Sequence, residues 1–269
     1  MMPGEWLDGQ SRPRRAGVAF ILRMKDTSDR RKPRAVTTRK VAELEELRFA
    51  WTANAAFRLD IAAFSVEQGE RILLTGHSGS GKSTLITLLT GAVLATSGRV
   101  QVLGQDLGQL SAGTRDRFRA DHIGVIFQTL NLIPYLSIID NVLLPLSFSP
   151  LRASRLPGAQ RQAEAARLLE RLGIDPGSHA GLSTSQLSVG QQQRVAAARA
   201  LIGGPDLVIA DEPTSALDRA SRDAFLELVL SETKRAGSAF LMASHEAGLE
   251  ALFDRTIRME DLLIARSPA

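Results

Sequence analysis

The sequence predicts an α/β fold built around a parallel sheet. LVIAD (207–211) and AFLMAS (239–244) are continuous apolar runs, which are typical of parallel strands buried on both faces. The segment between them, 218–237, has the period of an amphipathic helix and ends at Gly237. A strand, a helix and a strand in that order indicate a crossover unit of a parallel sheet.

Short apolar or alternating runs predict further strands earlier in the chain. They are RFAW (48–51), FRLDIAAFSV (57–66), RILLT (71–75), 99–103 and 122–127, with the ordered domain expected to begin near Val41. The stretch 157–187 differs from these. AQRQAEAARLLERLG (159–173) has a helical period with Gly173 as a stop signal, and a loop rich in Gly and Ser follows.

The composition is that of an ordinary globular protein. The chain has 269 residues, of which 44% are hydrophobic and 23% are charged, and this suits one α/β domain with a subdomain. It has no Cys, which excludes disulfides and cysteine-based zinc sites. The uncharged stretch 123–139 is interrupted by Gln128, Asn131 and Pro134 and falls short of the ~20 apolar residues that a membrane-spanning helix needs.

Positive charge is concentrated near the N-terminus. Residues 1–40 contain eleven Lys or Arg and four Asp or Glu, although the net charge of the whole chain is only +4. We expect residues 1–40 to form a basic, disordered extension, or to be shortened by a start at Met24. An arm that binds acidic lipid head groups or nucleic acid is the alternative. The segment GVAFIL (17–22) is too short, and too closely followed by Arg23, to be the apolar part of a secretory signal.

A phosphate-binding loop follows the strand 71–75. The stretch from Gly76 to Ser83 fits GxxxxGK[ST] and lies between a predicted strand and a predicted helix. Backbone N–H groups of such a loop wrap a phosphate chain, Lys82 would reach the β and γ phosphates, and the Ser83 hydroxyl would hold Mg²⁺. His77 is expected to be an exposed spacer. The nucleotide-binding residues expected here are Gly76, His77, Ser78, Gly79, Ser80, Gly81, Lys82, Ser83 and Thr84.

Two acids end the buried strand LVIAD. Asp211 and Glu212 lie where an open α/β sheet binds its ligands. One acid there can anchor Mg²⁺, and the second can orient and deprotonate an attacking water. Acids often end strands without any such role, so this pattern predicts a catalytic site only in combination with the phosphate-loop motif.

A second stretch also has the character of an anion site. LSVGQQQR (187–194) presents a Ser hydroxyl and the backbone N–H of Gly190 at the mouth of an alanine-rich helix. The chain already has a stronger phosphate loop, so the stretch raises the question of what a second phosphate-binding element is for.

Five motifs taken together resemble one family. They are GHSGSGKST, FQ at 127–128, LSVGQQQR, LVIADEPTSALD and SH at 244–245, and in this order they are similar to the nucleotide-binding subunit of ATP-binding cassette (ABC) transporters over about residues 43–262. The stretch FQTLNLIPYLSIIDNVLLPL most resembles the lipoprotein-releasing and macrolide-exporter branch. The resemblance implies a P-loop NTPase fold with a RecA-like parallel-sheet core, an N-terminal antiparallel β subdomain and a helical subdomain at about 129–187.

The resemblance also assigns roles to residues. Glu212 matches the catalytic base, and His245 matches the switch histidine that touches the γ-phosphate. Gln128 matches the glutamine that contacts Mg²⁺ and the attacking water, so the expected metal ligands are Ser83, Gln128 and Asp211. Trp51 is the candidate for stacking on adenine, with Phe49 and Phe57 as competitors, and Asp218 matches the aspartate that faces a partner's phosphate loop.

The signature stretch departs from the family pattern in two ways. Val189 replaces a usual glycine, and 184–186 lacks the proline often found there. In the family the phosphate is met by the equivalents of Ser188, Gly190 and Gln191, so Val189 is compatible with an active site.

The resemblance implies an ATPase subunit whose partners lie at a membrane. Two copies are expected to close on ATP and Mg²⁺ and so to energise a separately encoded permease, with residues 129–150 docking a coupling helix. The protein would then be cytoplasmic and peripheral on the inner face of the cell membrane, and nucleic acid is not an expected partner. The substrate and the direction of transport are not readable.

Two rivals remain open. The cassette could drive a membrane partner in cell-envelope regulation or division without moving a solute. It could also be a soluble cassette protein of DNA repair or translation, although these usually carry a second cassette or a long insertion, and here 105 residues without Cys separate Lys82 from Leu187.

Overall fold

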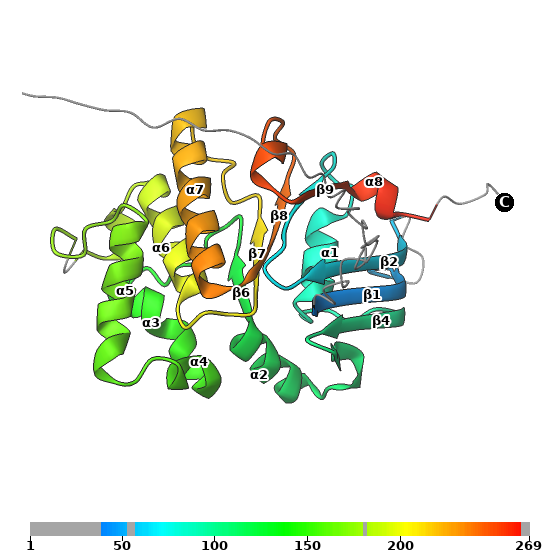
Figure 1. Ribbon diagram of the computed structural model, residues 1–269, viewed down its shortest axis with the longest axis horizontal. Helices are drawn as coiled ribbons and strands as arrows, with labels where there is room; N and C mark the ends of the chain where they lie inside the picture. The colour runs from blue at the N-terminus through cyan, green and yellow to red at the C-terminus, as the bar shows by residue number, and fades with distance from the viewer. Residues whose placement is uncertain (1–38, 53–56, 180–181, 265–269) are drawn as a thin grey trace, which may run out of the picture. The chain divides into compact units, whose positions relative to one another are not determined.

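The structure, a computed structural model, describes residues 39–52, 57–179 and 182–264 (Figure 1). Its strands are β1 (Lys40–Phe49), β2 (Leu59–Glu67), β3 (Arg71–Thr75), β4 (Ser97–Val102), β5 (Gln105–Asp106), β6 (Ile123–Ile126), β7 (Leu207–Asp211), β8 (Ala239–Ser244) and β9 (Arg255–Arg258). Its α-helices are α1 (Lys82–Leu89), α2 (Ala112–His122), α3 (Ile138–Phe148), α4 (Pro150–Ser154), α5 (Ala159–Arg171), α6 (Val189–Leu201), α7 (Arg219–Ala236) and α8 (Met259–Leu262). Short 3₁₀ turns lie at Leu107–Gln109, Thr184–Gln186 and Glu250–Leu252.

A five-stranded parallel sheet is the centre of the fold, in the order β6-β7-β8-β3-β9. The predicted strands 71–75, 207–211 and 239–244 have the observed bounds, and β9 was not predicted. Because side chains alternate along a strand, the sheet has two buried faces. Val208 and Phe240 belong to the core cluster that includes α5, α6 and α7, whereas Ile209 and Leu241 belong to the cluster that includes α1 and the second sheet.

The second sheet is antiparallel, with the order β2-β1-β4-β5. It lies beside α1 at the opposite side of the parallel sheet from α5 and α6 (Figure 1). The expected strand 48–51 is only the end of β1, which already begins at Lys40 and stops at Phe49, so Trp51 lies beyond it. Of the expected extension 1–40, residues 1–38 lie outside the described residues.

Helices α3, α4 and α5 fill the segment expected to be a helical subdomain. The apolar residues Val142, Leu168 and Leu169 pack into one core cluster with Val195 and Ala198 of α6. Ser137 caps α3 by accepting a hydrogen bond from the backbone N–H of Asp140 at 3.1 Å. Helix α6 therefore belongs equally to this helical segment and to the face of the parallel sheet.

A buried arginine joins α4 to the end of α6. Arg152 is only 2% exposed, and its guanidinium donates to the carbonyls of Ala200 at 2.9 Å and Ile202 at 2.8 Å. Burial lowers the pKa of Arg152 to about 10. The last carbonyls of a helix lack intrahelical partners, so this side chain satisfies them and holds α4 against α6.

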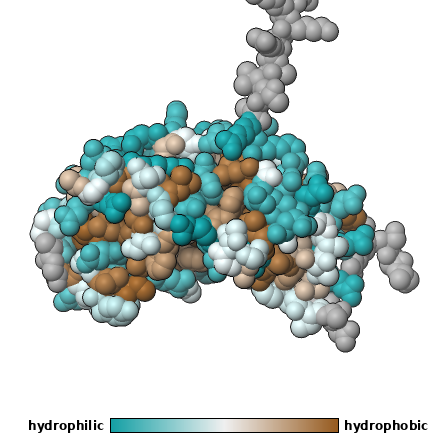
Figure 2. All heavy atoms as spheres, turned by 90° about the horizontal axis from the view of Figure 1, so that it is seen from below, coloured by the Kyte–Doolittle hydropathy of each residue, from teal (hydrophilic) through white to brown (hydrophobic). Residues whose placement is uncertain are grey.

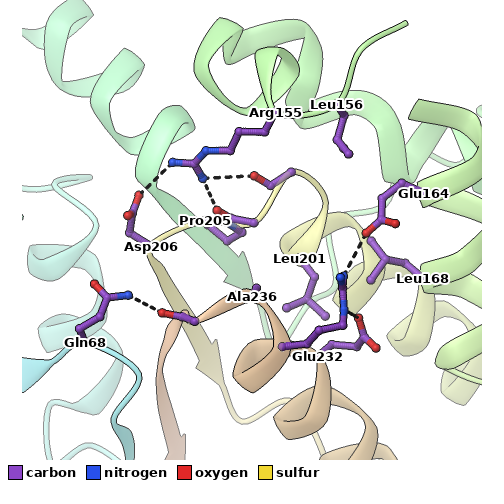
Figure 3. Close-up of a pocket in the computed structure, with 14 residues that line it drawn as sticks. Gln68, Arg155, Leu156, Glu164, Leu168, Leu201, Pro205, Asp206, Glu232 and Ala236 are labelled. Carbon is purple, nitrogen blue, oxygen red and sulfur yellow. Dashed lines mark hydrogen bonds and ion pairs between the residues drawn. The ribbon is translucent and has the colours of Figure 1, made fainter. Parts of the chain in front are cut away.

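An ion-pair cluster joins α5 to α7. Glu232 of α7 is 3% exposed and accepts hydrogen bonds from Arg167 of α5 at 2.8 Å and from Arg235 at 2.9 Å. Arg235 also pairs with Glu164 at 3.1 Å, and Figure 3 shows Glu164 and Glu232 at one side of a 360 Å³ pocket. Burial opposes ionisation of Glu232, but the arginines outweigh it and hold the pKa of Glu232 at about 2.

Replacing Glu232 by Gln is expected to lower the free energy of unfolding at pH 7 by roughly 2 kcal/mol, since it removes the buried carboxylate that Arg167 and Arg235 share and leaves both with Glu164 as their acidic partner. A carboxylate whose pKa is lowered by folding stabilises above its unfolded value of about 4.5 and loses this contribution as pH falls toward 2. The difference from the wild type in urea unfolding should therefore be smaller at pH 4 than at pH 7. Glu227→Gln, at an exposed position of the same helix, is the control and should change stability little at either pH. An equal loss in both variants would contradict the role of the cluster.

Candidate nucleotide site

The carboxyl ends of four neighbouring strands bring together four of the predicted site segments. The register pairs Ile126 of β6 with Ala210 of β7, and Asp211 with Ala243 of β8. Thr75 of β3 pairs with Ser244. Gln128, Asp211, His245 and Gly76 each lie at or within two residues of one of these strand ends, so four segments far apart in the sequence meet at one edge of the sheet.

The phosphate loop depends on glycine backbone geometry. Gly79 and Gly81 have φ values of 80° and 107°, which side chains other than hydrogen rarely allow, and Gly81 immediately precedes α1. A Cβ at Gly81 would lie 2.8 Å from both Phe57 and Leu59, whereas one at Gly79 would meet open space. The loop therefore packs its last glycine against β2 and leaves Gly79 open to a ligand.

Lys82 lies at the centre of the loop. It is 5% exposed, and its Nζ donates to the carbonyls of Gly76 at 2.8 Å and His77 at 3.2 Å. The same Nζ lies 3.6 Å from Oε1 of Glu212. A buried ammonium is thus held by two carbonyls of the loop and lies beside the acid that follows β7.

The two acids at the end of β7 differ in environment. Burial raises the pKa of Asp211, a hydrogen bond from Ser83 counteracts this, and the charge of Glu212 raises it further. Asp211 Oδ1 is buried without a hydrogen-bond partner among the described residues. Glu212 instead lies 3.1 Å from Nδ1 of His245 as well as near Lys82.

The backbone of Glu212 is unusual. Its φ is 44°, in the left-handed region that costs a residue with a side chain roughly 1–2 kcal/mol. Its N–H donates to the carbonyl of Ala243 at 3.0 Å, which ties the bend to β8. The bend turns the chain at the end of β7, so that this carboxylate reaches both Lys82 and His245.

A cavity of 380 Å³ opens over the phosphate loop. The residues that line it are Trp51, Phe57, Ser78, Gly79, Gly81, Lys82, Ser83, Thr84, Gln128 and Glu212. Trp51 is 55% exposed and meets Phe49 edge to face, with 5.1 Å between ring centroids. An exposed aromatic ring and a loop of N–H groups that line one cavity suit a nucleotide, with its base on the first and its phosphates on the second.

Three residues of the phosphate loop, Gly76, His77 and Ser80, are not among the described residues that line the cavity. The His77 side chain is 73% exposed and lies 3.6 Å from Glu260 of α8, in agreement with a spacer position. Ser80 is buried, and its Oγ has no hydrogen-bond partner among the described residues. A Cβ at Gly76 would lie 2.7 Å from that oxygen, so the start of the loop is closely packed.

The signature stretch lies elsewhere on the same chain. Ser188 caps α6, because its Oγ accepts from the N–H of Gln191 at 3.3 Å while the Gln191 side chain accepts from the N–H of Ser188 at 2.9 Å. Val189 is 54% exposed, and a Cβ at Gly190 would meet only Leu217, at 3.4 Å. Among the described residues, those that line the 380 Å³ cavity do not include 188–191.

Asp218 also acts as a helix cap. It accepts from the N–H of Ser221 at 3.0 Å and from its hydroxyl at 2.6 Å, and these bonds lower the pKa of Asp218. It is likewise absent from the described lining of the cavity. The structure therefore groups the phosphate loop, Gln128, Glu212 and Trp51 at one cavity, and leaves the signature and Asp218 apart from it.

Sequence reasoning missed one residue that organises this edge. Glu246 accepts from the Thr214 hydroxyl at 2.9 Å and from Arg222 at 2.8 Å, and so joins the segment after His245 to the segment after Glu212. The only feature of the sequence that pointed to Glu246 was its position next to His245. Phe57, considered only as a competitor of Trp51, lines the cavity together with it.

The fold and the site define a class. A parallel sheet, a glycine-rich loop leading into a helix, a buried lysine and acids at the end of β7, one strand removed from β3 in the same sheet, constitute a phosphate-loop nucleoside triphosphatase. The family model described as ABC transporter matches residues 59–215. The chain belongs to the ABC transporter family, as an ATP-binding and ATP-hydrolysing subunit that energises a membrane partner.

Relatives with related names match most of the chain. It is 42% identical over 194 residues to the "Uncharacterized ABC transporter ATP-binding protein YbbA" of Escherichia coli, covering 72% of this chain and 82% of that protein. It is 40% identical over 203 residues to the "Lipoprotein-releasing system ATP-binding protein LolD" of Shewanella denitrificans, covering 76% and 84%. It is 40% identical over 197 residues to the "Macrolide export ATP-binding/permease protein MacB" of Rhodopseudomonas palustris, covering 73% of this chain and 29% of that protein. The resemblance to the lipoprotein-releasing and macrolide branch is thereby confirmed.

Solved cassettes share the fold. The dimeric ATP-binding cassette MJ0796, in a post-hydrolysis state bound to ADP and Pi, has a TM-score of 0.71 and 29% identity, covering 81% of this chain and 93% of that one. A second dimeric structure of MJ0796 has a TM-score of 0.72 and 30% identity over the same shares. In the present structure, the described helices include none with the length and apolar character that a membrane span requires.

Replacing Gly81 by Ala is expected to weaken ATP binding more than replacing Gly79 by Ala. Both changes put a side chain at positive φ, but only the Cβ at position 81 would also clash with Phe57 and Leu59. We expect Kd for a fluorescent ATP analogue to rise about tenfold in Gly79→Ala and at least a hundredfold in Gly81→Ala, with circular dichroism unchanged. Equal Kd values in the two variants would show that the packing against β2 does not shape the loop.

Proposed function

We propose that two copies of this chain close head to tail around two ATP molecules. In this arrangement the phosphate loop of one copy faces Ser188, Gly190 and Gln191 of the other. The observation that carries the proposal is that one chain holds two separate elements suited to phosphate. The phosphate loop lines the 380 Å³ cavity, whereas the exposed start of α6, which also has the character of an anion site, is not among the described residues that line it. The dimeric state of the MJ0796 cassettes supports it.

Each side of the composite site has a part in binding. The ring of Trp51, with Phe57 beside it, would stack on adenine, while Lys82 and the N–H groups of the loop hold the phosphates. Asp218 would face the partner's phosphate loop from the start of α7. Closure completes each site, which is how hydrolysis is coupled to movement of a bound permease.

Glu212 is the proposed base for the attacking water. Its carboxylate is the one acid among the described residues that line the cavity, and its bend at the end of β7 holds it beside Lys82 and His245. His245 would contact the γ-phosphate, and Gln128 would contact the water. The work of these side chains is positioning and charge stabilisation, because phosphoryl transfer needs little else from the protein.

We also propose that Mg²⁺ is bound by Ser83, Gln128 and Asp211. All three offer oxygen ligands, which this hard cation prefers. The Asp211 oxygen that is buried without a hydrogen-bond partner among the described residues fits such a ligand, and a cation there would offset the burial that raises the Asp211 pKa. When bound, Mg²⁺ neutralises part of the charge that develops on the phosphates.

The membrane partner is proposed to be a separate permease that docks between α2 and α3. A 480 Å³ groove lies there, with Phe127, Leu144 and Phe148 among its lining residues, and the first and last of these are 42% and 63% exposed. Figure 2 shows hydrophobic surface on this underside of the molecule. A short amphipathic helix of the permease fits such a groove, with Arg119 and Asp116 as polar contacts at its edge.

Two further points concern the permease. YbbA and LolD are matched over more than four fifths of their length and are named ATP-binding proteins, which supports a permease on another chain. Docking would place this protein on the cytoplasmic face of the cell membrane as a peripheral subunit.

Glu212→Gln is expected to retain ATP binding, lower ATPase turnover at least a hundredfold and accumulate an ATP-bound dimer. The amide keeps the size of the side chain but can no longer accept the proton of water. Turnover is checked by phosphate release, and the dimer by light scattering with and without ATP. Normal turnover in this variant would refute the catalytic assignment.

Ser188→Arg is expected to abolish ATPase activity while leaving nucleotide binding by the monomer within twofold of the wild type. The large cation would occupy the space that the partner's phosphates need, but it lies outside the described lining of its own chain's cavity. Binding is checked with a fluorescent ATP analogue at low protein concentration. The control is Ser185→Arg, at an exposed position nearby, which tests whether an added positive charge by itself lowers ATPase turnover. Thr184 is not used for this control because it is buried. Wild-type turnover in Ser188→Arg would refute the composite site.

A further inference from the structure

Arg199 reaches from α6 to the turn that follows Gln128. Its Nη1 donates to the carbonyl of Asn131 at 2.6 Å, and its Nη2 donates to the carbonyl of Leu130 at 2.5 Å. The Arg199 side chain is partly buried, and this burial lowers its pKa. One guanidinium thus binds two successive carbonyls of a loop that lies nearly 70 residues earlier in the chain.

The turn that it holds is strained. Leu130 and Asn131 have φ values of 47° and 50°, and two successive residues with side chains in the left-handed region are unusual. Asn tolerates this region, but for Leu it is unfavourable. Hydrogen bonds from a charged donor are stronger than neutral ones, so the two bonds from Arg199 stabilise the turn against this strain.

The strained turn fixes the residue before it. The N–H of Leu130 donates to the carbonyl of Phe127 at 3.1 Å, which closes a tight turn with Gln128 at its first corner. On its other side Gln128 is only two residues from the end of β6, which is in register with β7. Gln128 therefore has a rigid strand before it and a turn after it whose shape depends on Arg199.

We propose that Arg199 is a positioning residue for ATP hydrolysis, acting by holding Gln128 at the nucleotide cavity. The inference rests on the role proposed above for Gln128. Helix α6 would then have two roles. Ser188 lies at its N-terminus, and Arg199, near its C-terminus, holds the turn that follows Gln128. Arg199, Phe127 and Asn131 line the groove assigned to the permease, so a docked helix would lie against the same turn.

The test compares Arg199→Gln and Arg199→Lys with Arg161→Gln. Arg161 is the matched control, since its guanidinium also donates to two carbonyls, those of Leu156 at 3.0 Å and Ala153 at 3.3 Å, but does so within the α4–α5 segment. We expect Arg199→Gln to lower kcat of the full chain at least tenfold with KM for ATP within twofold. Arg199→Lys should retain an intermediate kcat, and Arg161→Gln should stay within twofold of the wild type.

A double-mutant cycle with Gln128→Ala separates positioning from a merely structural role. If Arg199 acts through Gln128, Arg199→Gln should lower kcat by less than twofold when Gln128 is already Ala. A further tenfold loss in that background would overturn the inference about Arg199 and leave the role of Gln128 standing. A wild-type kcat in Gln128→Ala would overturn the proposed role of Gln128 and this inference with it. Thermal unfolding is measured for each variant, and if Arg199→Gln does not fold, the same cycle with Arg199→Lys decides.

Discussion

The register of four parallel strands is the constraint on which the site depends. Because β6, β7, β8 and β3 are neighbours with aligned carboxyl ends, whatever follows each strand must lie at the same edge. Helices and the antiparallel sheet cover the two faces of the parallel sheet and keep water from its strands, but they do not determine where the site lies. A shift of one residue in any of these pairings would turn its side chains to the other face and move its loop away from Lys82.

Charge balance at that edge follows from the same constraint. The buried ammonium of Lys82 has two loop carbonyls and the Glu212 carboxylate as partners, while Asp211 is left with its charge opposed by burial. These two acids are adjacent in sequence yet differ in environment: Asp211 is partly buried beside Ser83, whereas Glu212, which has left-handed backbone, lies beside Lys82 and His245. Backbone strain is thus located between the two carboxylates for which we propose different tasks.

Much of this was accessible from sequence, and the reasons are local. Continuous apolar runs gave the bounds of β7 and β8, and the glycine pattern identified the loop, because both signals need only neighbouring residues. β9 was missed since RTIR is polar and is a strand only through its pairing with β3. The contact between Arg199 and the turn after Gln128 was also inaccessible, because it joins residues far apart and leaves no periodic signal in either segment.

The capping of α6 explains how Val189 can stand in the signature. In this helix the Ser188 oxygen and the Gln191 side chain are engaged with each other's backbone, and the other end of the Gln191 amide meets His179 at 3.1 Å. The N–H groups of Val189 and Gly190 belong to the first turn, where helix geometry provides no intrahelical acceptor. A Ser hydroxyl that accepts one hydrogen bond can still donate its proton. The anion-binding capacity that we propose for this helix start therefore rests on two backbone N–H groups and one O–H, none of which a valine side chain removes. In the proposed dimer the Val189 side chain, which is 54% exposed, would limit only how closely a partner's phosphate can approach.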